Sequence, residues 1–204
     1  MKLEGEFTFS GPRTEVWELL QDPEVLIKAL PGATKMEKTD EDKYESVMEV
    51  RVGPVSGTFS STIELSDKVV PESYNMQVNG KGKSGFVKGS ATIQLEEKGS
   101  DETLMKYAAD LKVGGKLASV GQRLLDTVGK SMARQSLESM NAALEHHMGG
   151  NTEDKAEYVP PSQAKFAAGV AKDVAGDSIK NPKFWALLVI LGAGIAGIVW
   201  YFTK

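Results

Sequence analysis

Residues 34–113 alternate apolar and polar side chains with a period of two, and this alternation constrains the fold more than any other feature of the chain. Turn-forming pairs such as Gly53-Pro54, Asn79-Gly80 and Gly99-Ser100 interrupt the pattern. A period of two puts apolar side chains on one face of a strand, and short turns between consecutive strands favour antiparallel pairing. The sequence therefore predicts an antiparallel sheet with one wet face, and glycines within its strands indicate that the sheet curls.

The segments on either side of this region have other periods. Residues 3–9 alternate like one more strand, and two short helical segments follow, ending near Leu20 and near Pro31-Gly32. Residues 116–148 carry apolar side chains at helical spacing, which predicts one long helix. The expected fold class is α+β: a curled sheet of six to seven strands wraps around the long helix, with two short helices after the first strand.

Composition narrows the range of chemistry. The chain has 204 residues, a net charge of −4 and no cysteine. The charge disfavours nucleic-acid binding, and the absence of cysteine excludes disulfides, thiolate metal sites and cysteine nucleophiles. The adjacent His146 and His147 do not share a helix face, so they form a poor metal pair. We expect no catalytic residue and no metal site.

Residues 184–202 carry no charged side chain and predict a single-pass transmembrane helix, about 29 Å long at the helical rise. Trp185 at one end and Trp200 and Tyr201 at the other suit the two membrane interfaces. Since the chain begins without an apolar signal-peptide segment, we expect the soluble domain on the cytoplasmic side of the cell membrane.

The chain therefore divides into a domain at 1–148, a linker at 149–182 and an anchor at 183–204. Residues 163–179 space Phe166, Val170 and Val174 as a short amphipathic helix would, either at the bilayer surface or at a partner enzyme. Gly192 and Gly197 leave room in the anchor for close helix pairing, so an oligomer formed through the tail stays open.

A long helix over a curled sheet leaves space where it does not touch the sheet, and such an apolar space is a common small-molecule site. Methionines at inward positions suit varied apolar ligands, but they also serve as ordinary core filler. Inward tyrosines offer hydroxyls either to a ligand or to the backbone. The candidate cavity residues are Met48, Phe59, Tyr74, Met76, Ile93, Met105, Tyr107, Leu124, Val128 and Met132.

The segment GKGKSGFVKG at 80–89 lies between two expected strands, so we interpret it as a hairpin and not as a phosphate-binding loop. Its side chains Lys81, Lys83, Phe86 and Lys88 are candidates for the cavity mouth or for contact with a membrane.

Several motifs resemble those of the CoxG family of carbon monoxide dehydrogenase accessory proteins, within the START-like (SRPBCC) helix-grip superfamily that also contains Bet v 1-like proteins. They extend over residues 1–148 and are Val16-Trp17 with Asp22-Pro23, Leu30-Pro31-Gly32, Val52-Gly53-Pro54-Val55 with Gly57, Gly80-Lys81-Gly82 with Gly85 and Gly89, Thr103 with Tyr107, and Gly114-Gly115-Lys116-Leu117-Ala118 leading to Gly121-Gln122-Arg123. Where many family members carry a cysteine after the Pro-Gly turn and paired aromatics in the long helix, this chain has Ala33 and Gln135-Ser136-Leu137.

The resemblance implies a non-catalytic accessory protein of a molybdenum carbon monoxide dehydrogenase or a related oxidoreductase. Such a protein recruits the enzyme to the membrane and carries a lipid-like electron acceptor, a quinone such as menaquinone or ubiquinone, with no covalently bound cofactor. The alternatives are a general lipid carrier and a helix-grip enzyme, a cyclase or hydrolase acting on an apolar substrate.

Overall fold

The computed structural model describes residues 1–148 and Lys172, and the predicted linker at 149–182 and anchor at 183–204 otherwise lie outside the described residues. No helix within 1–148 combines the length and the apolar character that a bilayer crossing requires. The elements, in chain order, are β1 (Lys2–Phe9), α1 (Arg13–Leu19), α2 (Pro23–Ala29), β2 (Ala33–Asp40), β3 (Lys43–Val52), β4 (Val55–Val69), β5 (Ser73–Gly82), β6 (Gly85–Glu97), β7 (Thr103–Gly114), the 3-10 helix η1 (Gly115–Val120) and α3 (Gln122–Met148).

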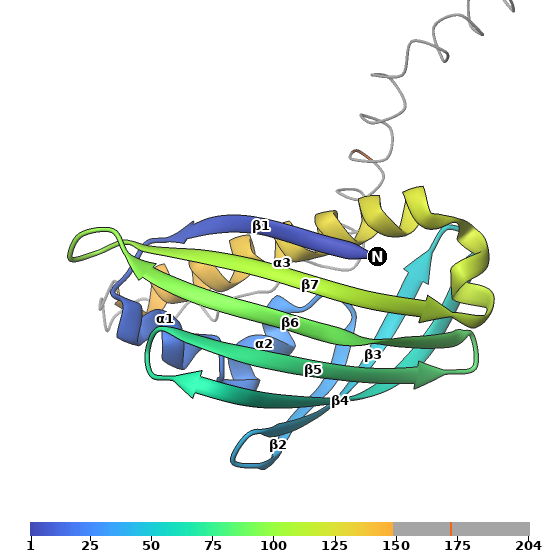
Figure 1. Ribbon diagram of the computed structural model, residues 1–204, viewed down its shortest axis with the longest axis horizontal. Helices are drawn as coiled ribbons and strands as arrows, with labels where there is room; N and C mark the ends of the chain where they lie inside the picture. Colours follow the sequence, from blue (N-terminus) through green and yellow to red (C-terminus); the bar gives the residue numbers. More distant parts are fainter. Residues whose placement is uncertain (149–171, 173–204) are drawn as a thin grey trace, which may run out of the picture.

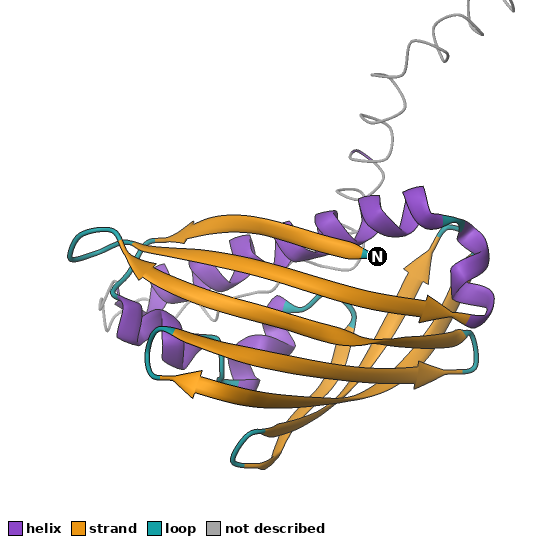
Figure 2. Ribbon diagram, in the orientation of Figure 1, coloured by secondary structure: helices purple, strands orange, loops and turns teal. Residues whose placement is uncertain are grey.

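All seven strands form one antiparallel sheet in the order β1-β7-β6-β5-β4-β3-β2. Consecutive hairpins join β2 through β7, and β1 pairs with β7, so that Phe7 lies opposite Met105 and Phe9 opposite Thr103. The sheet curls, with β2 and β3 crossing behind the other strands, and α3 runs along its open side (Figures 1 and 2). The predicted fold class, an α+β helix-grip arrangement, is confirmed within these residues.

The two short helices follow β1 as predicted. The Asp22 side chain caps α2 by accepting a hydrogen bond from the Glu24 backbone N–H at 2.8 Å, and Pro23 occupies the first helical position. Both helices lie close to α3, and together they cover one end of the concave face.

The long helix begins later than its apolar spacing predicts. Residues 115–120 form the 3-10 helix, and α3 starts at Gln122 instead of at Lys116. Gly121 separates the two helices with a φ of 90°, a conformation that disfavours any residue with a side chain. The single segment predicted at 116–148 is therefore two helices that meet at this glycine.

Two apolar clusters form the core, and α3 contributes to both. Leu137, Met140 and Leu144 of its second half pack with α1, α2 and the adjacent strand ends, while Leu125 and Val128 of its first half pack with η1 and the β3–β4 hairpin. Leu144 is 1 % exposed, so the helix is firmly seated at its C-terminal end. The region between the two clusters is the middle of the concave face.

Candidate functional site

The ten predicted cavity residues divide between the two core clusters. Tyr74, Ile93 and Met105 are buried in the first cluster, with Met76 and Tyr107 packed against it, whereas Phe59 and Val128 are buried in the second, with Leu124 and Met132 against it. Met48 belongs to neither cluster. The prediction therefore grouped residues that share a face but do not form one contiguous lining.

The middle of the concave face is incompletely packed. Met48 on β3, Ile63 on β4 and Val78 on β5 are half-buried, although they share the inward parity of buried neighbours such as Tyr44 and Phe59. None of the three packs against either cluster. Accessible surface on inward apolar side chains means that space lies beside them. The alternation contains Ile63 and Val78, yet parity alone does not distinguish a packed position from an open one.

Three inward tyrosines have different environments. The Tyr44 hydroxyl donates to the Gln21 carbonyl oxygen at 3.0 Å, so this side chain is used by the fold. The Tyr74 and Tyr107 hydroxyls form no hydrogen bond with any described residue. Tyr74 is only 6 % exposed and lies edge-on to the Trp17 ring, with 5.5 Å between the ring centroids.

Burial keeps these phenols protonated. It raises the pKa of Tyr74 and of Tyr107 above the ordinary value, and burial together with the nearby Asp42 carboxylate raises the pKa of Tyr44. A protonated phenol carries one O–H donor. Tyr74 and Tyr107 therefore have a donor that the described protein does not use.

A pair of serines adds polarity to the same face. The Ser46 and Ser61 hydroxyls lie 2.6 Å apart, and Ser46 is 2 % exposed. One O–H is used within the pair, which leaves the other as a donor. Apolar periodicity does not identify these serines, since they interrupt it.

The four mouth or membrane candidates lie outside this concave face. Lys81, Phe86 and Lys88 are exposed on the outer face of β5 and β6, and Lys83 is in the turn between these strands. The predicted hairpin at 80–89 is present, with Gly82 paired to Gly85.

The outer face of β2–β5 also carries a groove of about 290 Å³. Its lining is mostly polar, so it offers an apolar ligand little favourable burial. The residues that line it are Lys35, Glu45, Ser46, Val47, Ser60, Ser61, Thr62, Asn79 and Lys81.

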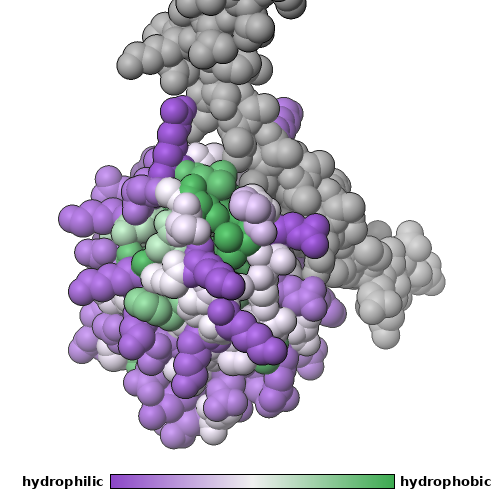
Figure 3. All heavy atoms as spheres, turned by 90° about the vertical axis from the view of Figure 1, so that its right-hand side faces the viewer, coloured by the Kyte–Doolittle hydropathy of each residue, from purple (hydrophilic) through white to green (hydrophobic). Residues whose placement is uncertain are grey.

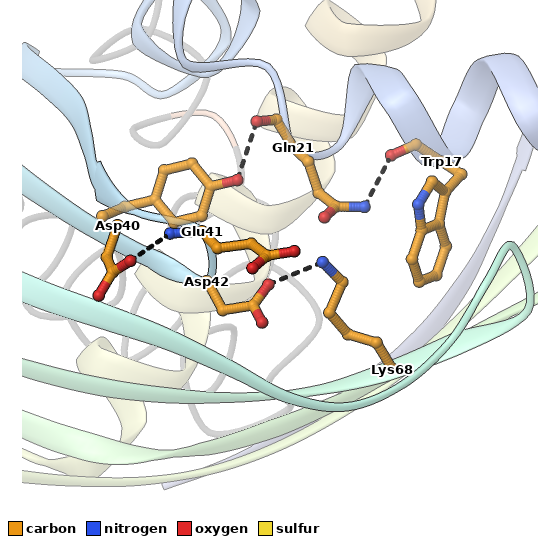
Figure 4. A network of polar contacts seen from close by, with 7 residues as sticks. Trp17, Gln21, Asp40, Glu41, Asp42 and Lys68 are labelled. Carbon is orange, nitrogen blue, oxygen red and sulfur yellow. Dashed lines mark hydrogen bonds and ion pairs between the residues drawn. The ribbon is translucent and has the colours of Figure 1, made fainter.

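Polar contacts at the α1 end of the molecule are structural (Figure 4). The Gln21 side-chain amide donates to the Trp17 carbonyl oxygen at 3.3 Å, and the Lys68 ammonium group donates to Asp42 at 2.7 Å. With Tyr44, these groups join α1 to the β2–β3 hairpin and to β4. Residues 1–148 contain no cluster of side chains suited to hold a metal ion, and His146 and His147 are exposed in the last turn of α3.

Solved structures share this fold. A conserved protein from Geobacillus kaustophilus is 31% identical with a TM-score of 0.68, and the match covers 72% of this chain and 96% of that one. The Zhui aromatase/cyclase from Streptomyces sp. R1128 is 15% identical with a TM-score of 0.57, over 74% of this chain and 98% of that one. A START superfamily protein from Mycobacterium smegmatis is 15% identical with a TM-score of 0.51, over 74% of this chain and 99% of that one. The latter two likenesses concern the fold alone.

No curated protein matches the chain in sequence. The family described as the carbon monoxide dehydrogenase G-type subunit (CoxG) matches residues 5–145, which include every strand in whole or in part and nearly all of α3. That match spans well over half of the chain and agrees with the motifs that first indicated it. The chain therefore belongs to the CoxG family, with the helix-grip fold of the START/SRPBCC superfamily.

Proposed function

We propose that this protein is a membrane-anchored accessory protein of a molybdenum carbon monoxide dehydrogenase or a related enzyme, and that its concave face carries a quinone such as menaquinone or ubiquinone. Family membership supports the accessory role. The concave face supports the ligand, and the tail sequence supports the anchor. The protein would recruit the enzyme to the membrane and deliver the electron acceptor, while the redox chemistry belongs to the enzyme.

The unpartnered hydroxyl of Tyr74, beside an incompletely packed apolar face, is the observation that carries this proposal. A quinone has an apolar ring and tail together with carbonyl acceptors. Tyr74 would donate to a carbonyl, while Met48, Ile63 and Val78 would contact the apolar part. Removing about 200 Å² of apolar surface from water is worth about 5 kcal/mol, so modest contact suffices for binding.

The inward positions of β3–β7 carry apolar side chains, glycine, serine and tyrosine, with no carboxylate or histidine among them. A general acid–base pair needs such groups beside the substrate. A neutral lining with isolated donors suits the binding of a neutral, mostly apolar molecule.

A membrane quinone reaches a soluble enzyme poorly through water because its apolar surface is costly to hydrate. The predicted anchor at 183–204 would keep the domain near the bilayer, and the linker at 149–182 would let it reach both membrane and enzyme. The protein would thereby remove the aqueous step from electron transfer.

Ligand identity is tested by purifying the full chain in detergent, extracting it with organic solvent and identifying bound molecules by mass spectrometry. We expect a quinone or a related isoprenoid lipid. Failure to recover one, together with failure to bind added menaquinone or ubiquinone, would refute the carrier function.

Tyr74→Phe and Tyr44→Phe form a matched pair for the mode of binding. Loss of one hydrogen bond worth about 0.5–1.5 kcal/mol predicts that Tyr74→Phe binds menaquinone roughly 2- to 12-fold more weakly. Tyr44→Phe should retain quinone affinity because its hydroxyl already bonds to Gln21. Equal affinities of the two variants would contradict the role given to Tyr74.

The anchor is tested separately by membrane fractionation of the full chain and of a chain that ends at Lys183. We expect the full chain in the membrane fraction. Its recovery in the soluble fraction would exclude the anchor without affecting the ligand result.

A further inference from the structure

Cations without carboxylates gather at the end of the sheet where the β3–β4 and β5–β6 hairpins turn. Residues 50–57, 79–90 and 111–124 contain seven cationic side chains and no aspartate or glutamate, in a chain whose net charge is −4. We call these cations, together with Phe86, the basic end: Arg51, Lys81, Lys83, Lys88, Lys112, Lys116 and Arg123.

Ser84 joins the three segments into one surface. Its hydroxyl donates to the Ser56 carbonyl oxygen at 2.8 Å, and its own carbonyl oxygen accepts from the Leu117 backbone N–H at 2.8 Å. The β3–β4 hairpin, the β5–β6 hairpin and η1 are thus held together at the right-hand end of the molecule (Figure 1). The cations therefore belong to a fixed part of the fold.

Two of the lysines oppose each other directly. Lys88 on β6 is the register partner of Lys112 on β7, and both are exposed on the outer face. Like charges at such a pair destabilise a sheet. Neither lysine pairs with a carboxylate among the described residues, so the fold gains nothing from their charge.

An exposed aromatic ring lies among these charges. Phe86 is 40 % exposed, its register partner on β5 is Lys81, and the Lys88 ammonium nitrogen is 5.9 Å from the ring centroid. On its other side the ring covers Gly114, where any side chain would overlap it. Seen end-on, apolar side chains form a patch within a polar surround (Figure 3).

Exposed aromatic rings beside lysines are typical of side chains at the level of lipid headgroups. We propose that the basic end docks the domain onto an anionic phospholipid bilayer, with its lysines at the phosphates and Phe86 among the headgroups. This docking rests on the proposed function, because a carrier must meet the membrane that supplies its ligand. It is independent of the tail.

The opposite end has the reverse charge. Val69 and Val70 are exposed there, but carboxylates dominate the surrounding turns and helices. An anionic surface repels that end and attracts the basic end, which gives the domain one preferred orientation. The carboxylates are Glu15, Glu18, Asp22, Glu24, Asp40, Glu41, Asp42, Asp67, Glu72, Glu96, Glu97, Asp101 and Glu102.

The test uses residues 1–148 without the tail. These residues contain the whole sheet, both core clusters and α3, and 96% of the Geobacillus chain is matched by 72% of this one, so the domain folds as a unit. Sedimentation with vesicles of phosphatidylcholine containing about one third phosphatidylglycerol should show binding that weakens as salt rises from about 0.1 M to about 0.5 M. Pure phosphatidylcholine vesicles should bind much less.

Lys88→Gln/Lys112→Gln should weaken binding to the anionic vesicles about 25-fold, since each lysine near such a surface contributes about fivefold. Its melting temperature should not fall, because the substitution removes a repulsion. The matched control Lys28→Gln/Lys98→Gln removes the same charge elsewhere and should bind like the parent domain. Equal losses in the two double variants would overturn the proposal.

Phe86→Ala distinguishes a bilayer from an acidic protein surface by charge-independent insertion. It should weaken vesicle binding severalfold at both low and high salt. Binding of the domain to purified partner enzyme through the same lysines, with no binding to anionic vesicles, would assign the basic end to the protein and refute lipid docking. Quinone recovery from Lys88→Gln/Lys112→Gln should be unchanged, so failure of docking is separable from failure of the carrier function.

Discussion

Two isoleucines on the concave face test whether its middle is open. Ile63 on β4 is half-buried and packs against neither core cluster, whereas Ile93 on β6 is 4 % exposed within the first cluster. Replacing a buried side chain in a well-packed core by a larger one costs about 1–3 kcal/mol. We therefore expect Ile93→Phe to lower the free energy of unfolding by about 1–3 kcal/mol, and Ile63→Phe to lower it by less than about 0.5 kcal/mol.

Urea unfolding of residues 1–148, followed by circular dichroism, measures both values. The two substitutions are chemically identical and occur at inward strand positions, so their difference reports the local space. Ile63→Phe should also reduce quinone binding, because the added ring would occupy the space meant for ligand. Similar losses of stability in the two variants would show that the middle of the concave face is packed, and would remove the physical basis for a ligand there.

Two further results are expected from groups that the fold uses. Thr103 is 0 % exposed and donates to the Gly11 carbonyl oxygen at 2.8 Å, so Thr103→Val should destabilise the domain by about 1–3 kcal/mol in the same urea assay; an unchanged midpoint would mean that Gly11 finds another donor. Burial raises the pKa of Tyr74 above that of the unfolded chain, so the folded state retains a proton that the unfolded state releases near pH 10. The stability linked to this proton is present below about pH 9 and falls above pH 10, by up to about 1.4 kcal/mol per pH unit, and Tyr74→Phe should show a shallower alkaline decline.

The strands whose inner faces lie in the core were predictable because burial selects apolar residues at every second position. β2 shows where this reasoning weakens. Of its eight residues only Met36 is buried, since the strand lies at the sheet edge and borders the core at a single position. An alternation needs at least two buried positions to be visible, so β2 left little trace in the sequence.

The candidate site was less predictable, since its properties depend on partners that are distant in sequence. Tyr44 and Tyr74 have the same parity, yet only Tyr44 meets a carbonyl oxygen, that of Gln21 in the segment between α1 and α2. The Ser46–Ser61 pair likewise depends on the register of β3 and β4. Residue type and spacing specify the face on which a side chain lies, but only tertiary packing determines whether its polar atom has a partner.

The features without a stabilising role occur at the places assigned to function. Lys88 opposite Lys112 adds repulsion to an otherwise regular sheet, and the Tyr74 hydroxyl is buried without a described partner. Each departs from what folding alone favours, and sequences typically tolerate such departures where another requirement operates. A bound molecule with a carbonyl group would satisfy Tyr74, and an anionic bilayer would relieve the repulsion between the two lysines. Because a quinone in an anionic membrane supplies both conditions at one location, a single encounter with the bilayer would account for both departures.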